Sequence, residues 1–92
     1  MIIKGYAFKK DEREIQKKYS DRFSEISHLR ESIRFEFQPD YARTHFSGEL
    51  LTEEAMKLSE FDIALLADSG NLCFGGECTK YGNRFRGSYC TD

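Results

Sequence analysis

The sequence predicts a single small α+β domain, with an antiparallel sheet of four to five strands and helices on one face, in the order β-α-β-β-α-β-β. Three observations predict this class. Apolar residues recur at three- and four-residue steps over residues 10–30, which is typical of an amphipathic helix. Apolar and polar residues alternate in several short runs, as in half-buried strands. Residues 58–91 have the pattern of a capped helix, a glycine stop and a β-hairpin. Such a mixture of strands and helices favours an α+β domain.

Composition limits the size and class of the domain. The chain has 92 residues, 39% of them hydrophobic and 33% charged, which fits one globular core and is too short for two. No apolar run approaches the ~20 residues that span a bilayer, and residues 1–4 do not resemble a signal peptide. Three cysteines are an odd number in a short chain and do not predict a disulfide framework. We therefore expect one domain over residues 1–92 in the cytoplasm, without membrane contact.

The N-terminal half predicts a strand, a helix and two further strands. Residues 2–8 form a short strand candidate. The helix over residues 10–30 rests on five apolar residues that share one face: Ile15, Tyr19, Phe23, Ile26 and Leu29. Residues 33–37 alternate as a half-buried strand, and residues 38–40 have turn chemistry. Residues 41–50 are expected to be the returning strand, which Gly48 weakens.

The next stretch predicts two capped helices. Thr52 before Glu53 and Glu54 is an N-cap signature, so we expect a short helix over residues 53–57. Ser59 with Asp62 three residues later forms a capping box for a helix over residues 60–68. A cap explains Asp62 better than a buried charge does. The glycine at position 70 then supplies a left-handed residue that ends this helix.

The C-terminal stretch predicts a β-hairpin around a two-residue turn, Gly82-Asn83. This turn pairs Tyr81 with Arg84, Thr79 with Arg86, and Glu77 with Ser88. The face that carries Arg84 and Arg86 is expected to meet solvent or a partner. The opposite face is expected to pack on the helices; it carries Leu72, Phe74, Cys78, Lys80, Phe85 and Tyr89.

Motifs for metal binding or catalysis are weak. Cys73, Cys78 and Cys90 have the spacing C-x4-C then C-x11-C, which lacks the paired C-x2-C of zinc sites. Cys73 and Cys90 share a face and could be bridged if oxidised, although free thiols fit a reducing cytosol better. Neither His28 nor His45 is placed near a cysteine, as nucleophilic catalysis would require. We expect no metal, no cofactor, no small-molecule substrate and no enzyme activity; an enzyme of unfamiliar design would need a pocket of convergent ionisable groups.

Three surfaces are candidates for binding a partner. The chain has a net charge of −2, but residues 46–68 hold six acidic side chains and one basic side chain. Polarity of this kind suits docking onto a charged partner. The candidates are the basic helix residues Lys10, Arg13 and Lys17, the hairpin-tip residues Lys80, Tyr81, Arg84 and Arg86, and the acidic residues Glu53 and Glu54. Each has a structural alternative: a solvated helix with ion pairs, a protected hairpin edge, and helix-start charges.

The stretches ALLADSGNLCFGG and YGNRFRGSYCTD resemble the C-terminal ends of small proteins encoded by bacteriophages and mobile elements. In size and character the chain is similar to anti-CRISPR proteins. This resemblance implies a non-catalytic inhibitor in the host bacterial cytoplasm that binds a type I RNA-guided surveillance (Cascade-like) complex. The partners would be Cas proteins and could include the guide RNA, and the inhibitor would sterically block target DNA binding. It implies no individual functional residue, because such inhibitors share no common active constellation. The near-neutral charge differs from that of strongly acidic, DNA-mimicking members.

A second class of function is an independent RNA- or single-stranded-DNA-binding module. Such a module would stack bases on Tyr81 and Phe85 over the open face of the sheet. Binding to naked nucleic acid with a steep dependence on salt would favour this module. Binding only to a protein-bound nucleic acid would favour the inhibitor.

Overall fold

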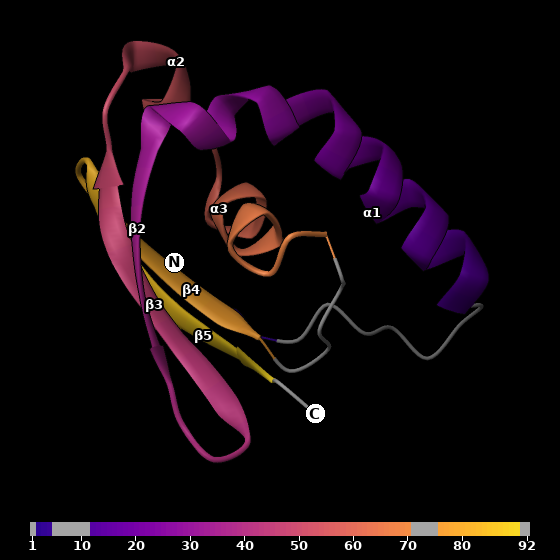
Figure 1. Ribbon diagram of the computed structural model, residues 1–92. Helices are drawn as coiled ribbons and strands as arrows, with labels where there is room; N and C mark the ends of the chain where they lie inside the picture. Colours follow the sequence, from indigo (N-terminus) through magenta and orange to yellow (C-terminus); the bar gives the residue numbers. More distant parts are fainter. Residues whose placement is uncertain (1, 5–11, 71–75, 91–92) are drawn as a thin grey trace.

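A five-stranded antiparallel sheet forms one layer of the molecule, and the helices cover one of its faces (Figure 1). In this computed structural model the described residues are 2–4, 12–70 and 76–90, with side chains described from residue 19 onward. The elements are β1 (Ile2–Lys4), α1 (Glu12–Ile26), the 3-10 helix η1 (Ser27–Ser32), β2 (Ile33–Pro39), β3 (Arg43–Leu50), α2 (Glu53–Met56), α3 (Glu60–Ala67), β4 (Glu77–Tyr81) and β5 (Arg84–Cys90). The predicted α+β class and element order are confirmed.

The strands lie in the order β1-β4-β5-β3-β2, so β5 is at the centre of the sheet. Two hairpins, β2–β3 and β4–β5, lie side by side, and β1 adds a short strand to the outer edge of β4. α3 packs on one face of the sheet, and α1 lies on the same side of the sheet and packs against α3 (Figure 1). The opposite face is therefore left without a helix over it among the described residues.

Several predicted boundaries in the N-terminal half need correction. The α-helix ends at Ile26 and continues as the 3-10 helix η1, whose tighter turns place Leu29 in the core. The first strand covers residues 2–4, and residues 5–8 of the predicted strand lie outside the described residues. Strand β2 continues to Pro39, two residues beyond the predicted end, and the return strand begins at Arg43.

The core is built from α3 and from the aromatic residues of the sheet. Every residue of α3 from Asp62 to Ala67 is buried. On the sheet, Phe46 and Phe85 are 3% and 1% exposed and lie on neighbouring strands. Phe46 is paired with Gly87, and Phe85 is paired with Gly48. Each ring therefore packs beside a glycine, so Gly48 makes room for a ring and is not a weak point of the strand.

The predicted capping box of α3 is confirmed, and Asp62 has a second role. The Asp62 backbone N–H donates to Ser59 Oγ at 3.1 Å, and the Ser59 N–H donates to Asp62 Oδ2 at 3.2 Å. The Asp62 carboxylate also accepts two hydrogen bonds from the Arg22 guanidinium on α1, both at 2.9 Å. Asp62 is therefore both the cap that the sequence predicts and a buried charge with an ion-pair partner, a second role that the cap interpretation did not include. The predicted left-handed residue, Gly70, has φ 77°.

The terminal hairpin has the predicted register. Tyr81 pairs with Arg84, Thr79 with Arg86, and Glu77 with Ser88. The turn uses a positive φ of 65° at Gly82. The Asn83 carbonyl accepts a hydrogen bond from the Leu50 N–H at 2.7 Å, which ties the hairpin turn to the end of β3. The predicted helix-facing residues Leu72 and Phe74 lie outside the described residues.

Candidate functional site

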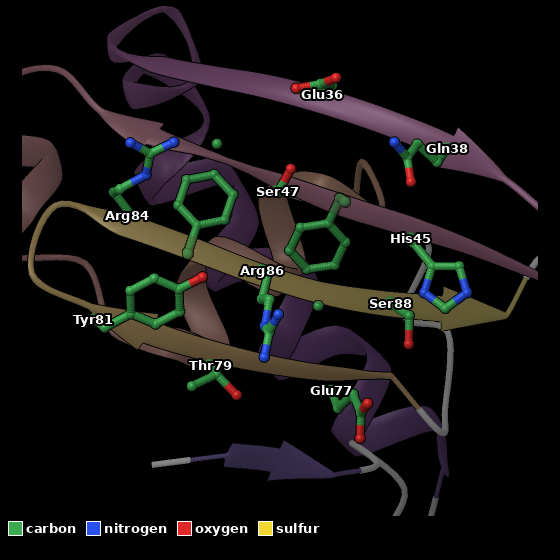
Figure 2. A pocket seen from close by; sticks show the side chains of 14 residues that line it. Glu36, Gln38, His45, Ser47, Glu77, Thr79, Tyr81, Arg84, Arg86 and Ser88 are labelled. Carbon is green, nitrogen blue, oxygen red and sulfur yellow. The ribbon is translucent and has the colours of Figure 1, made fainter.

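The sheet face opposite the helices is a concave, polar surface with a cavity of about 710 Å3 (Figure 2). We call it the open face. Because side chains alternate along a strand, every second residue of β2 to β5 points to this face. The polar side chains that line it are Glu36, Gln38, His45, Ser47, Glu77, Thr79, Tyr81, Arg84, Arg86 and Ser88.

The strand register arranges these side chains in rows across the sheet. Arg86 on the central strand has Ser47 of β3 on one side and Thr79 of β4 on the other. The small side chains of Ser47 and Thr79 leave space around the longer Arg86 side chain, which Figure 2 shows between β4 and β5. Arg84 lies in the next row, with Tyr81 as its neighbour on β4. The positive charge of Arg84 and Arg86 therefore lies along β5, with the hydroxyl groups of Ser47 and Thr79 on either side of Arg86.

Arg84 and Arg86 have no ion pair or hydrogen bond with any residue in the described part of the chain, and both side chains are exposed. Two other arginines of the sheet do form such contacts within the protein. Arg34 Nη1 lies 3.2 Å from Glu49 Oε1, and Arg43 Nη2 donates to Ser88 Oγ at 2.9 Å. The guanidinium groups of Arg84 and Arg86 can thus bind a partner without breaking an ion pair or hydrogen bond to the described residues, which lowers the cost of binding.

The open face carries both signs of charge. By strand alternation four arginines share this face with three carboxylates: Arg34, Arg43, Arg84 and Arg86 with Glu36, Glu49 and Glu77. A nucleic acid laid across the whole face would bring its phosphates near Glu36 and Glu77, which repel them. A protein surface with charges of both signs fits better, because each charge can face its opposite.

The predicted hairpin-tip residues lie on both faces of the sheet. Tyr81, Arg84 and Arg86 lie together on the open face (Figure 2). Lys80 points to the helix side, where its Nζ donates to the Met56 and Leu58 carbonyls at 2.5 and 2.8 Å. These carbonyls lie at the end of α2, where a cation is favourable. Lys80 therefore joins the hairpin to α2, and we exclude it from the candidate site.

The described residues of the other predicted surfaces belong to helices α1 and α2. Lys10 is outside the described residues, and Arg13 and Lys17 belong to α1 in the helix layer, where their side chains are not described. Glu53 and Glu54 begin α2, which Thr52 caps by accepting the Ala55 N–H at 3.1 Å. Their position matches the helix-start alternative, because acidic residues stabilise the first turn of a helix.

Sequence reasoning missed the contribution of the middle hairpin to this surface. Glu36 and Gln38 on β2, with His45 and Ser47 on β3, form half of the open face. The alternation of apolar and polar residues in each strand was visible in the sequence. The pairing of β3 with β5 is a long-range contact, however, and only this pairing places the two hairpins in one surface.

The base-stacking role predicted for Phe85 is wrong. Phe85 is on the helix side of the sheet and is 1% exposed, whereas Tyr81 is 50% exposed. Because the side-chain period of a strand is two residues, Phe85 cannot share a face with Arg84 and Arg86. The open face offers Tyr81 as its exposed ring near the two arginines.

The described residues contain no cluster of three or more histidine, cysteine, aspartate or glutamate side chains that could hold a metal ion. Cys73 lies outside the described residues. Cys78 belongs to strand β4, and its side chain is fully buried in the core. Burial, with a smaller effect of the Glu60 carboxylate, raises the pKa of the Cys78 thiol to about 12. A thiol with this pKa is a poor nucleophile at neutral pH.

We expect Cys78 to resist alkylation in the folded protein. With iodoacetamide at pH 8, its rate is expected to be at least about 100-fold slower than in the unfolded chain, because the thiolate is rare and inaccessible. Mass spectrometry of the peptide that contains Cys78 measures this rate, and the same peptide in denaturant is the control. Equal rates in both states would contradict the buried position of Cys78.

No family model matches the chain, and neither a curated protein nor a solved structure matches it. None of the described helices is long and apolar enough to cross a bilayer.

Proposed function

We propose that the protein is a non-catalytic inhibitor of the anti-CRISPR type, which binds a bacterial type I RNA-guided surveillance complex and blocks target DNA binding. The observation that supports this proposal is the open face, a concave polar surface with two exposed arginines, Arg84 and Arg86, that have no ion pair or hydrogen bond to the described residues. The class of partner rests on the resemblance of the two C-terminal stretches to anti-CRISPR proteins. The inhibitor would act by occupying space where the target strand must pair with the guide.

The charges of the open face favour protein subunits as the main contact. Arginine and tyrosine are the residues that most often dominate binding energy at interfaces, and Tyr81 adjoins Arg84 on a hairpin with fixed register. A preformed sheet surface loses little conformational entropy on binding. Arg84 and Arg86 could also reach phosphates of the guide RNA where the complex exposes them.

The test is binding to a purified Cascade-like complex. Arg84→Glu with Arg86→Glu is expected to weaken binding by about 100-fold or more, because two central guanidinium groups become carboxylates. Lys57→Glu is a control for charge reversal elsewhere: it reverses one exposed charge between α2 and α3, away from the open face, and should leave affinity unchanged. Biolayer interferometry measures the affinities.

A second pair tests the helix surface. Lys10→Glu with Arg13→Glu should have little effect if the open face is the docking surface. Loss of binding in this pair alone would move the site to α1. If neither pair weakens binding to the complex, the basic residues are not the contact and the proposal fails in this form.

The alternative, an independent module for RNA or single-stranded DNA, is supported by the half-exposed Tyr81 beside Arg84. It predicts binding to naked nucleic acid that weakens steeply with salt. Tyr81→Ala would then abolish binding to a naked oligonucleotide. Absence of such binding, together with binding to the protein complex, decides for the inhibitor.

A further inference from the structure

Strand β2 is an edge of the sheet, because it pairs with β3 on one side and with no described strand on the other. It is seven residues long. Edge strands of this length present unpaired backbone groups that can bind another strand, and proteins usually protect them. The free edge of β2 is therefore a candidate for strand pairing.

The register shows which backbone groups are free. The Leu51 N–H donates to the Ser32 carbonyl at 2.8 Å, and the Asp40 N–H donates to the Arg43 carbonyl at 2.7 Å. Hydrogen-bonded pairs alternate with non-hydrogen-bonded pairs in an antiparallel ladder. Ser32 and Asp40 both belong to hydrogen-bonded pairs, so every second residue between them does as well. The even-numbered residues of β2 therefore form the backbone hydrogen bonds to β3.

The odd-numbered residues of β2 consequently direct their N–H and C=O groups to the free edge. Phe35 and Phe37 are the residues in the middle of this set. Pro39 belongs to the same set, and proline has no N–H to offer, which fits a position where the N–H would face outward. The Ile33 N–H is already bonded to the Arg30 carbonyl, so Ile33 offers its C=O alone.

The charged side chains of β2 are complementary to those of a second, antiparallel copy of β2. If two β2 strands pair antiparallel around a two-fold axis at Phe35, then Arg34 of one copy faces Glu36 of the other, twice. Opposite charges in facing positions stabilise a strand pair. A two-fold axis at Glu36 would instead place the two Glu36 carboxylates against each other. The charges thus favour the axis at Phe35 over the axis at Glu36.

A two-fold axis at Phe35 also buries apolar surface at this edge. Phe37 is 37% exposed and stacks on Phe35, with ring centroids 5.4 Å apart. Pairing at Phe35 places Phe37 beside Ile33 of the second copy, on the helix side of both sheets. The exposed part of the Phe37 ring would then be covered.

We propose that two copies of this chain associate through their β2 edges into a continuous ten-stranded sheet. Phe35 pairs with Phe35, and the Phe37 N–H donates to the Ile33 carbonyl of the second copy, for about four backbone hydrogen bonds in total. This contact is small, so the dissociation constant is expected to be on the order of 0.1–1 mM. The contact uses Arg34 and Glu36 at the β2 margin of the open face and leaves Tyr81, Arg84 and Arg86 free, so it does not rest on the proposed inhibitor function.

The test combines sedimentation with NMR between about 20 µM and 1 mM. Sedimentation velocity is expected to show a monomer at the low end and a dimer fraction at the high end. In amide spectra, Phe35 and Phe37 should shift with concentration, whereas Arg34 and Glu36, bonded to β3, should shift less. A monomer over the whole range, or shifts confined to another surface, overturns the proposal.

Charge reversal tests the pairing register. Glu36→Arg places two arginines in each facing position and is expected to weaken the dimer at least about tenfold. Adding Arg34→Glu to this variant restores opposite charges and should restore the dimer. If the double variant is no better than the single one, the two-fold axis does not lie at Phe35.

A proline variant tests the backbone contact without relying on charge. Phe37→Pro removes an outward N–H and keeps the ladder with β3, so it should abolish the dimer and leave the monomer folded. Circular dichroism confirms the fold. Dimerisation of a folded Phe37→Pro variant at wild-type strength would exclude the β2 edge as the interface.

Discussion

Gly48→Ala is expected to cost about 3–5 kcal/mol of folding free energy, a large part of the stability of a small domain. A Cβ at position 48 would lie 1.8 Å from the Arg34 carbonyl oxygen and 2.9 Å from Cζ of Phe85. The carbonyl belongs to the backbone of β2 and cannot move alone. The methyl group would therefore force β2 and β3 apart and displace the buried Phe85 ring. Urea denaturation followed by circular dichroism measures the loss.

Two control variants separate this effect from ordinary sensitivity of the strands. Ser47→Ala changes the neighbouring residue on the open face and adds no atom to the core. Gly82→Asn changes the glycine of the hairpin turn, which has φ 65° and no atom within 4 Å of an added Cβ; asparagine tolerates this conformation. Both should lose less than about 1 kcal/mol. A Gly48→Ala variant as stable as these controls would contradict the close packing at Gly48.

The reason for this sensitivity is a short motif, F-x-G, that is present on both of the paired strands β3 and β5. Phe46-Ser47-Gly48 on β3 and Phe85-Arg86-Gly87 on β5 run antiparallel, so each phenylalanine faces the glycine of the other strand. The two rings lie 6.1 Å apart between their centroids. The middle residues, Ser47 and Arg86, point to the open face. The same six residues thus hold the core together and place an arginine at the centre of the candidate site.

Local signals in the sequence predicted most of the fold. The capping box of Ser59 and Asp62, the left-handed Gly70 and the Gly82-Asn83 turn each involve residues within a few positions of one another. Their geometry depends on the neighbouring backbone, so the sequence determines it directly. The hairpin register followed from the turn, and it correctly separated Arg84 and Arg86 from Phe85.

Long-range contacts could not be predicted in the same way. The local sequence shows Gly48 only as a glycine that weakens its strand. The ring that occupies the space beside Gly48 belongs to Phe85, which is 37 residues away, so no local pattern reveals this contact. The open face likewise requires the pairing of β3 with β5, which no local pattern specifies. The motif F-x-G in the predicted strands is a partial signal of the pairing, since a ring and a glycine that face each other fill one space, but it also occurs at residues 74–76 and so does not specify which strands pair.

The ion pair between α1 and α3 is the second long-range feature, and Arg22→Met tests it. The Asp62 side chain is 7% exposed and the Arg22 side chain is 44% exposed. Removing Arg22 leaves the buried carboxylate with the Ser59 cap alone. We expect a loss of about 2–3 kcal/mol at pH 7, since an uncompensated buried charge is costly. Methionine keeps the packing of the aliphatic stem, so the loss reports the charge.

The pH dependence of this loss identifies its cause. In the wild-type protein, burial raises the pKa of Asp62, but hydrogen bonds from Arg22 and Ser59 outweigh burial and hold the pKa below its usual value of 3.8. The wild-type contribution is therefore fully present above about pH 4 and is lost as the pH falls through the folded pKa. In Arg22→Met the effect of burial prevails, so the pKa of Asp62 rises and its carboxyl group binds a proton more readily. At low pH the buried charge is neutralised, and the variant loses less stability.

The stability difference between wild type and Arg22→Met should consequently be largest near pH 7 and shrink below about pH 4. Urea denaturation at pH 7, 5, 4 and 3 measures it. In an Asp62→Asn background the same Arg22→Met change should cost less than about 1 kcal/mol at every pH, because no charge is left unpaired. A pH-independent loss in the native background would mean that Arg22 stabilises the α1–α3 contact by packing, and that the charge of Asp62 is satisfied by its cap.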